Sequence, residues 1–268
     1  SYAIVATSFF VKKIGTGRFS MGELLKNKVC IVTGSTRGIG KEIALLFASE
    51  GAEVVVNGTR VGTADKWIKE SVYQGHLHPY YFDITNPSEV RRNVMRIKKE
   101  FRKIDVLVNN AAIEFNELIG MISRENMEKM FNVNVYGMIE VIQAVSRIMA
   151  RNENGGSIIN ISSMVAIRGN AGQLVYSATK GAIIALTKSA AKELAPQKIR
   201  VNSIAPGLTQ TEMLEQADIE KLQGRINNIC MGRIAQPSDI AGGCLLLASD
   251  YSGYISGQIL PVDGCTIM

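Results

Sequence analysis

Short apolar runs alternate along this chain with longer segments whose apolar residues recur at helical spacing. The short runs are rich in valine and isoleucine, as strands buried on both faces of a parallel sheet are. The pattern predicts strands at Val29–Thr33, Glu53–Asn57, Tyr80–Ile84, Asp105–Asn110, Ser157–Ser163, Ile199–Ile204 and Gln258–Val262. It predicts helices at Lys41–Glu50, Pro87–Glu100, Phe131–Arg151, Leu174–Ala195 and Ser238–Ala248. Strands that alternate with helices indicate a doubly wound parallel sheet of about seven strands, with helices on both faces.

A glycine-rich turn joins the first predicted strand to the first helix, in the order Thr33-Gly-Ser-Thr-Arg-Gly-Ile-Gly40. Glycine lets the backbone approach a pyrophosphate closely, and the first turn of the helix offers free N–H groups to it. The glycine spacing alone is a weak signal, but its position at a strand-to-helix joint predicts a Rossmann-like dinucleotide site. One single domain over residues 21–268 accounts for the whole pattern.

The end of the second strand indicates which dinucleotide binds. Sites that prefer NAD usually place an acid there to hold the ribose hydroxyls. Here the strand ends in Asn57-Gly-Thr-Arg60, without an acid. Arg60, and Arg37 in the glycine turn, suit a 2′-phosphate, so we expect NADP(H). The alternative is that Arg60 only begins a solvated loop.

Polar residues follow the third and fourth strands. Asp83 is placed either to bond the adenine amino group or to cap the next helix, a role for which Thr85 competes. His76 and His78 are expected in a loop, without a metal role. Asn109 and Asn110 are expected to tie neighbouring strands together beside a flat ligand.

Reactive groups are expected in the second half of the chain. Tyr176 and Lys180 lie four residues apart, on one face of a predicted helix. An adjacent ammonium lowers the pKa of a phenol from about 10, which suits a general acid or base. Ser163 ends the fifth strand, at the edge where open α/β sheets bind ligands. Asn134, taken by itself, reads as a buried and satisfied polar residue.

Composition narrows the class of protein only a little. The chain has 268 residues and a net charge of +6, and no apolar run reaches the roughly 20 residues of a membrane helix. Cys30, Cys230, Cys244 and Cys265 have no metal-ligand spacing, which is typical of a reduced, cytoplasmic protein. Residues 1–20 contain three basic side chains and no acid, and we interpret them as an extension or an expression remnant, with a trimmed organelle-targeting segment as the alternative. Without them the net charge falls to +3, so nucleic acid is not an expected partner.

These motifs, in this order and spacing, resemble the short-chain dehydrogenase/reductase family over essentially all of residues 25–268. The run Gly169–Lys180, with Val201–Gly207, is most similar to 3-oxoacyl-acyl-carrier-protein reductases. Two positions depart from the family pattern: Ala112 replaces a usual glycine, and Thr209 replaces a usual branched apolar residue.

The resemblance implies hydride transfer between a nicotinamide and a carbonyl or alcohol carbon. It implies that Tyr176 handles the proton, that Lys180 tunes Tyr176 and holds the ribose, and that Ser163 binds the substrate oxygen. It further implies that Asn134 holds a water that relays protons to Lys180, which replaces the reading of Asn134 as merely structural. The implied cofactor contacts are Gly34, Ser35, Thr36, Arg37, Gly38, Ile39, Gly40, Asn57, Gly58, Thr59, Arg60, Asp83, Ile84, Asn110, Ala111, Ala112, Tyr176, Lys180, Pro206, Gly207, Thr209 and Thr211.

Three functions are compatible with this reading. The first is an NADPH-dependent reductase of 3-oxoacyl thioesters, carried on acyl carrier protein or coenzyme A. The second is an NADP-dependent dehydrogenase of a sugar, polyol or other small secondary alcohol. The third, a non-catalytic NADP(H) sensor, is disfavoured by the complete reactive set. A carrier-protein reductase needs a basic patch beside the site. Its candidate members are Lys188, Lys192, Lys198 and Arg200, and the alternative is that these are ordinary solvated charges. Gln197, where a carrier-docking arginine is expected, leaves both readings open.

The remaining expectations concern assembly and access to the site. The polar segment from Leu208 to Ile226 has the composition of a lid over a site. The helices over residues 125–151 and 174–195 carry more apolar surface than one sheet face needs. By analogy with the family we expect a homotetramer, without a metal and without membrane contact.

Overall fold

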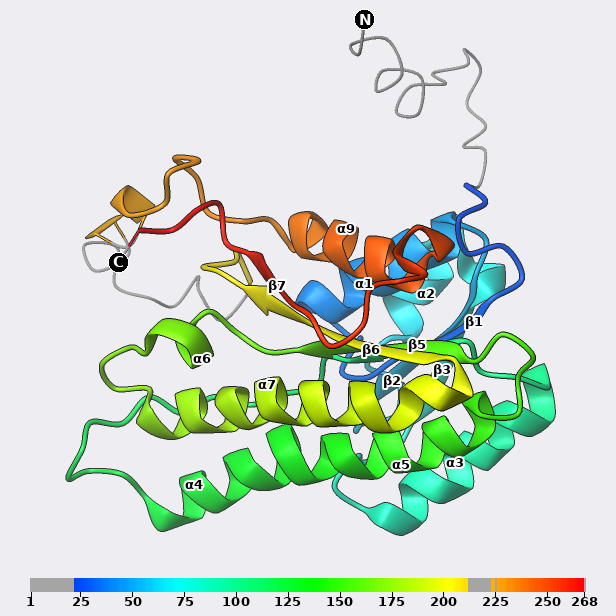
Figure 1. Cartoon of the computed structure of the whole chain (residues 1–268), viewed down its shortest axis with the longest axis horizontal. Helices are drawn as coiled ribbons and strands as arrows, with labels where there is room; N and C mark the ends of the chain where they lie inside the picture. Colours follow the sequence, from blue (N-terminus) through cyan, green and yellow to red (C-terminus); the bar gives the residue numbers. More distant parts are fainter. Residues whose placement is uncertain (1–21, 212–222, 225, 268) are drawn as a thin grey trace, which may run out of the picture.

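The computed structural model describes residues 22–211, 223–224 and 226–267, and these form one α/β unit around a single sheet (Figure 1). The predicted extension, and most of the predicted lid, lie outside these residues. All seven strands are parallel, in the order β3-β2-β1-β4-β5-β6-β7. The strands are β1 Val29–Val32, β2 Glu53–Gly58, β3 Leu77–Tyr81, β4 Val106–Asn109, β5 Gly156–Ile161, β6 Ile199–Pro206 and β7 Ile259–Val262. The predicted fold class is therefore confirmed.

Helices cover both faces of the sheet (Figure 1). On one face, α1 and α9 pack together over a core that includes Phe47, Cys244 and Leu247. On the other face, α3, α5 and α7 cover a core that includes Val94, Val145 and Ile183. The helices are α1 Gly38–Ser49, α2 Asp65–Glu70, α3 Pro87–Phe101, α4 Arg124–Phe131, α5 Met138–Met149, α6 Val165–Arg168, α7 Leu174–Leu194 and α9 Pro237–Ala248.

The chain order reverses at β1, because β2 and β3 extend to one side of it and β4 to β7 extend to the other. Loops that follow adjacent strands diverge at such a point, so ligands bind at the carboxyl ends of the strands there. The glycine turn after β1 and the exit of β4 both open at this point.

The third strand differs from its prediction, because it begins at Leu77 and ends at Tyr81. Pro79 is tolerated inside it because β3 is an edge strand, where one side of the ladder needs no donor. His78, predicted in a loop, lies in this strand. It contacts Glu53 Oε2 (2.6 Å), and His76 Nδ1 contacts the other oxygen of Glu53 (3.0 Å). Both histidines therefore fasten β3 to β2.

The predictions for the cap of α3 were also wrong. Neither Asp83 nor Thr85 caps this helix, because Asn86 Oδ1 accepts from the backbone N–H groups of Ser88 and Glu89. Asp83 instead accepts from the backbone N–H and the hydroxyl of Thr85, both at 2.8 Å. These bonds form a short-range turn in the loop after β3, which leads directly to Asn86 at the start of α3.

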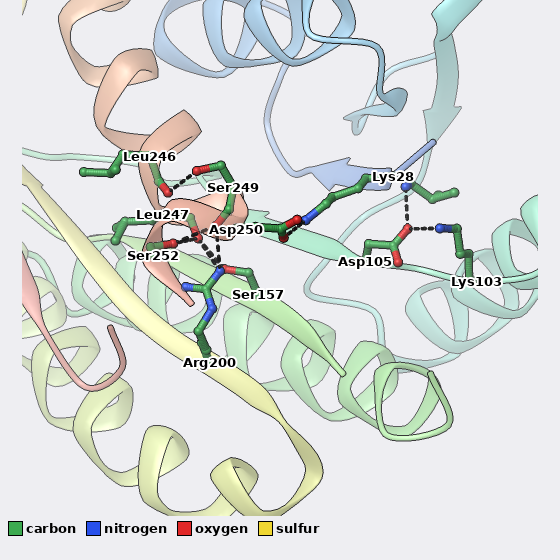
Figure 2. A network of polar contacts seen from close by, with 11 residues as sticks. Lys28, Lys103, Asp105, Ser157, Arg200, Leu246, Leu247, Ser249, Asp250 and Ser252 are labelled. Carbon is green, nitrogen blue, oxygen red and sulfur yellow. Dashed lines mark hydrogen bonds and ion pairs between the residues drawn. The ribbon is translucent and has the colours of Figure 1, made fainter. Parts of the chain in front are cut away.

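A polar network closes the amino-terminal edge of the sheet, away from the glycine turn (Figure 2). Arg200 on β6 donates from Nη2 to the carbonyl of Leu247 (2.8 Å), which also accepts from the hydroxyls of Ser157 and Ser252. Burial lowers the pKa of Arg200. Arg200 thus donates to backbone carbonyls at the end of α9. It is not available for the basic surface patch in which the sequence analysis placed it.

Candidate active site

The glycine turn connects β1 to α1 in a conformation that only glycine adopts freely. Gly34 and Gly38 have φ of +62° and +54°, in the left-handed region. A side chain on Gly34 would lie 2.7 Å from the Ala111 backbone, and one on Gly40 would lie 2.5 Å from the Gly34 carbonyl. The glycines therefore hold the turn tight against the exit of β4.

The first turn of α1 suits an anion. It contains no acidic residue, and the Arg37 side chain at its start does not cap it. Backbone N–H groups at such an end attract phosphate. Ser35 lies in the glycine turn, where its hydroxyl donates to the Val32 carbonyl (2.6 Å), and Ile39 lies in the first turn of α1. The residues present therefore fit the pyrophosphate of a dinucleotide.

The end of β2 lies beside this turn. A side chain on Gly58 would lie 2.4 Å from Thr36 Cγ2, so the two segments are in contact. The Trp67 indole on α2 donates to the Thr36 carbonyl (3.0 Å) and lies under the Lys41 ammonium. The sequence analysis missed this tryptophan because it did not assign α2. Thr59 and Arg60 are exposed just beyond β2.

Asn57, predicted among the cofactor contacts, is 2% exposed, and its amide is committed to the backbone. Its Oδ1 accepts from Gly34 N–H (3.3 Å), and its Nδ2 donates to the carbonyls of Tyr80 (3.3 Å) and Phe82 (3.1 Å). Asn57 therefore shapes the site by holding the glycine turn to β2 and β3.

The exit of β4 forms the floor of the site. Asn110 Nδ2 donates to the carbonyls of Thr33 (3.0 Å) and Gly34 (2.9 Å). Thr33 Oγ1 accepts from the backbone N–H groups of Asn110 and Ala111. Asn109 donates to Asn160 Oδ1 on β5 (2.9 Å). The asparagines thus tie neighbouring strands together, as the sequence predicted.

Lys180 on α7 reaches the carboxyl end of β5. It is 2% exposed, and its Nζ donates to the Ile161 carbonyl (2.8 Å). The same ammonium lies 5.5 Å from the centre of the Tyr176 ring. Ser162 Oγ donates to the Lys180 carbonyl (2.9 Å). These contacts place Tyr176 and Lys180 beside the strand end that leads to Ser163.

Burial dominates the ionisation of this pair. It lowers the pKa of Lys180 to about 8, against a smaller raising effect of the Glu114 carboxylate. It raises the pKa of Tyr176, and Glu114 adds to that rise. The predicted lowering of the Tyr176 pKa is therefore contradicted in the protein alone. Burial disfavours the charged form of each group, the phenolate of Tyr176 and the ammonium of Lys180.

Asn134 lies in a π-helical segment, Asn132–Gly137, between α4 and α5. It is fully buried: Oδ1 accepts from Ile113 N–H, and Nδ2 donates to the Ile113 carbonyl and to Thr179 Oγ1. Its amide therefore fixes the loop after β4 to α7. A single turn of π-helix often marks a functional position, which periodicity does not reveal. Ile84, buried after β3, contacts this segment at Gly137.

The exits of β5 and β6 complete the site. Ser163 Oγ accepts from Val165 N–H (3.3 Å) at the start of α6. Met164 N–H donates to the Pro206 carbonyl (3.0 Å), and Gly207 packs its backbone against Asp263. A side chain on Gly38 would lie 3.9 Å from Thr211 Cγ2, so this exit returns to the glycine turn.

The two departures from the family pattern are accommodated. The Thr209 hydroxyl donates to the Gly207 carbonyl (3.0 Å), which satisfies a polar group where the family usually has an apolar one. Ala112 is half-buried in the exit of β4, next to Ala111, which packs against Gly34. Neither residue disturbs the turn beside it.

Glu114 is a site residue that the sequence analysis missed. It follows β4 closely, and its charge acts on both Tyr176 and Lys180. The buried Gln173, on the turn before α7, donates to its carboxylate and accepts from Asn170 Nδ2 (2.7 Å). An acid two residues after the small residues at a strand exit was the available signal.

The chain matches the family model described as enoyl-(acyl carrier protein) reductase over residues 34–265. It is 39% identical to a 3-oxoacyl-[acyl-carrier-protein] reductase of Thermotoga maritima, covering 90% of this chain and 98% of the relative. It is also 39% identical to a 3α-hydroxysteroid dehydrogenase of Mediterraneibacter gnavus, covering 90% and 97%. A 3-oxoacyl-[acyl-carrier-protein] reductase of Chlamydia trachomatis is likewise 39% identical, covering 91% and 99%.

Fold, site and comparisons define a nicotinamide-dependent oxidoreductase. The chain belongs to the short-chain dehydrogenase/reductase family. Among the residues that the structure describes, no helix is both long enough and apolar enough to cross a membrane. Within the same residues, no group of three or more His, Cys, Asp or Glu side chains is arranged to hold a metal ion.

Proposed function

We propose that this protein is an NADPH-dependent reductase of 3-oxoacyl thioesters. The observation that carries the proposal is an apolar rim around the reactive residues. Five exposed apolar side chains flank the site on the loop after β4, on α6 and at the start of α7: Leu118, Ile119, Met121, Ile167 and Leu174. The loop after β4 and the turn before α7 are joined by a bond from Glu117 N–H to the Gly172 carbonyl (2.8 Å). Such a rim suits an acyl chain better than a sugar.

The reduction adds a hydride to the carbonyl carbon and a proton to its oxygen. NADPH supplies the hydride when bound. Tyr176 donates the proton, and its raised pKa supports this role because the phenol stays protonated at neutral pH. Ser163 holds the carbonyl oxygen and stabilises the charge that develops on it. Lys180 positions the ribose beside Tyr176, and Asn134 keeps the loop after β4 in place or holds the relay water that the family resemblance implies.

NADP(H) is the proposed coenzyme. The glycine turn would hold the pyrophosphate, and Arg60 and Arg37 would hold the 2′-phosphate, at the place where an NAD site carries an acid. The further residues that would contact the cofactor between its two ends are Gly58, Thr59, Asp83, Ile84 and Ala112. Those that would hold its nicotinamide half are Pro206, Gly207, Thr209 and Thr211. The exposed Arg60 at the end of β2 supports this assignment.

Acyl carrier protein is the proposed carrier of the substrate. Lys188 and Lys192 are exposed on one face of α7, and Lys198 is exposed just beyond it. These three lysines form the proposed basic patch for an acidic partner, without Arg200. A homotetramer is the proposed assembly, supported by the exposed Tyr136 and Ile139 on the outer face of the α4–α5 helix.

The second candidate is a dehydrogenase of a sugar, polyol or other small secondary alcohol. The hydroxysteroid dehydrogenase relative supports an alcohol substrate, and the rim favours an apolar alcohol over a sugar. The same reactive residues would serve, with Tyr176 accepting a proton in the oxidative direction.

The test is a comparison of substrates with the purified full chain. NADPH consumption is followed with an acetoacetyl thioester of coenzyme A or carrier protein, beside ketoses, small ketones and a 3-ketosteroid. Rapid turnover of the thioester, with NADH much poorer, is expected. Turnover of a ketosteroid or ketose with none of the thioester would overturn the acyl assignment and favour the second candidate.

A further inference from the structure

Two exposed cysteines lie on backbone segments that run antiparallel beside β7. Ile229 and Thr266 form an antiparallel bridge. Cys230 N–H donates to the Cys265 carbonyl (3.3 Å), and Ile267 N–H donates to the Asn228 carbonyl (2.6 Å). This register sets Cys230 directly opposite Cys265. Beyond this bond, Met231 N–H donates to the Gly264 carbonyl (3.1 Å), which holds the two segments together on both sides of the cysteines.

The spacing of such a pair suits a disulfide. Directly opposed residues in a hydrogen-bonded antiparallel pair have Cα atoms about 5.5 Å apart. Disulfides span Cα separations of about 4.4–6.8 Å. The thiols interact: burial, and then a hydrogen bond from the Cys230 thiol to Cys265, raise the pKa of Cys230. The paired backbones therefore bring the two thiols within reach of each other.

Cys265 occupies an unusual backbone conformation for a cysteine. Its φ is +57°, directly after Gly264 at +62°. Glycine and asparagine adopt this left-handed region at lower cost. Backbone preference therefore does not explain a cysteine at position 265, whereas its pairing with Cys230 gives the thiol a partner.

The other two cysteines provide an internal contrast. Cys30 on β1 and Cys244 on α9 are fully buried, and burial raises the pKa of each thiol. Buried, protonated thiols are inert. Oxidation should therefore distinguish the exposed pair from the buried pair within one molecule.

The pair lies where several parts of the fold meet. Arg168 of α6 donates to the Thr266 carbonyl and lies 3.8 Å from Asp263. Gly207, at the exit of β6, donates its N–H to the Val262 carbonyl (2.9 Å). A bond between Cys230 and Cys265 would thus join residues 228–231 to a segment that already contacts α6 and the β6 exit.

We propose that Cys230 and Cys265 form a reversible intramolecular disulfide on exposure to a hydroperoxide. One thiolate attacks a peroxide oxygen, which breaks the O–O bond and gives a sulfenic acid and, from hydrogen peroxide, one hydroxide. The second thiolate then attacks the sulfenic sulfur, expels its hydroxyl as a second hydroxide and closes the S–S bond. The two protons that the thiols released convert both hydroxides to water. The peroxide is reduced by two electrons, and a dithiol reverses the reaction. The thiolate is the nucleophile, so closure accelerates as pH rises toward the pKa of Cys230.

The experiment treats the folded full chain with hydrogen peroxide, then with iodoacetamide, and maps its unreduced peptides by mass spectrometry. The expected product is one linked peptide pair containing Cys230 and Cys265, about 2 Da lighter than the two thiol peptides together. It should disappear with dithiothreitol and form within a single chain on a non-reducing gel. Cys30 and Cys244 should be alkylated only after unfolding.

Cys265→Ser and Cys230→Ser are the matched variants. Neither should give the linked pair, and each in reducing buffer should melt and turn over like the reduced parent. The oxidised parent should melt several degrees higher than the reduced parent, because the bond constrains the unfolded chain. Oxidation of both thiols to sulfinic acids without the linked pair would overturn the proposal. A disulfide between two different chains would overturn it as well.

Discussion

At the scale of single residues, the chemistry depends on how far burial moves the protonation of Tyr176 and Lys180. Lys180 sits at the end of β5 with its ammonium on the Ile161 carbonyl and a pKa of about 8. Tyr176 has its pKa raised by the same desolvation. A phenol that stays protonated is prepared to donate.

Tyr176→Phe tests the proton donor. The change removes only the hydroxyl, so turnover should fall by about 10²- to 10⁴-fold, the usual contribution of a general acid. NADPH affinity, measured by fluorescence titration, should stay close to that of the parent. Tyr251→Phe, at an exposed tyrosine near the end of α9, is the matched control and should leave turnover unchanged. Retained turnover in Tyr176→Phe would remove this residue from the mechanism.

Glu114→Gln tests the electrostatics of the pair. The carboxylate raises the pKa of both Tyr176 and Lys180, so its removal should let both groups lose protons at lower pH. The alkaline limb of the pH profile for reduction should therefore move toward lower pH, as measured by kcat/KM for NADPH consumption. Glu128→Gln, on the exposed face of α4, should leave the profile in place. A shift toward higher pH would contradict the assigned role of Glu114.

At the scale of elements, the proposed cofactor site lies where β1, β2 and β4 end and α1 begins. Asn57 shows how the elements depend on each other, since one amide holds the glycine turn, β2 and β3 together. An aspartate at position 57 would have no N–H to give the Tyr80 and Phe82 carbonyls and would bury a charge. Coenzyme choice is therefore better tested at the exposed residues beyond β2.

Arg60→Ala tests the 2′-phosphate site. Loss of a charge-assisted hydrogen bond should raise the KM for NADPH by about 10- to 100-fold, while the KM for NADH should change little. Lys69→Ala, at an exposed lysine on α2, is the matched loss of one positive charge. Equal increases in both KM values for Arg60→Ala would mean that Arg60 does not read the phosphate.

Gly40→Ala tests the packing of the turn. A methyl group there would lie 2.5 Å from Asn110 Nδ2 and from the Gly34 carbonyl, so the turn must shift. We expect a lower melting temperature and weakened NADPH binding. Gly242→Ala on α9 meets nothing within 4 Å and should instead stabilise its helix by about 0.5–1 kcal/mol. Similar effects of both changes would show that helix propensity, rather than contact, controls position 40.

At the scale of the whole molecule, the carboxyl ends and the amino ends of the strands have different roles. The carboxyl edge carries the glycine turn, the reactive residues and the apolar rim. The amino edge carries the Arg200 network and the ion pairs Lys28–Asp250 and Lys103–Asp105 (Figure 2). Changes at the amino edge should therefore alter stability without altering the chemistry.

Arg200→Lys tests this separation. Lysine cannot reproduce a guanidinium that reaches the carbonyls of Leu247 (2.8 Å), Ser249 and Ile255 (both 3.4 Å). The free energy of unfolding should fall by about 1–3 kcal/mol, as measured by urea denaturation, because buried acceptors lose their donor. The kcat/KM of the folded enzyme should not change. Arg151→Lys, at an exposed arginine, should change neither quantity. A large loss of kcat/KM in Arg200→Lys would refute the separation.

The sequence by itself determined the order of the elements, the fold class and the location of the glycine turn. These features follow from local periodicity and from the conformational freedom of glycine, which are properties of short segments. It also identified the asparagines at the exit of β4. It missed α2 and the π-helical segment, and it displaced β3, because an edge strand with a histidine and a proline does not look like a buried one.

Only the tertiary structure decided in which direction the pKa of each reactive group moves and which polar side chains are held by hydrogen bonds to the backbone. The pKa of Tyr176 moves opposite to its prediction because desolvation depends on the packing of α7 against β5, which no local spacing encodes. The side chains of Asn57 and Arg200 point into the protein because they donate hydrogen bonds to backbone carbonyls that are distant in sequence, those of Phe82 and Leu247. Glu114 lies near Tyr176 and Lys180, and Cys230 lies opposite Cys265, because the loops that carry them follow the elements on which they pack.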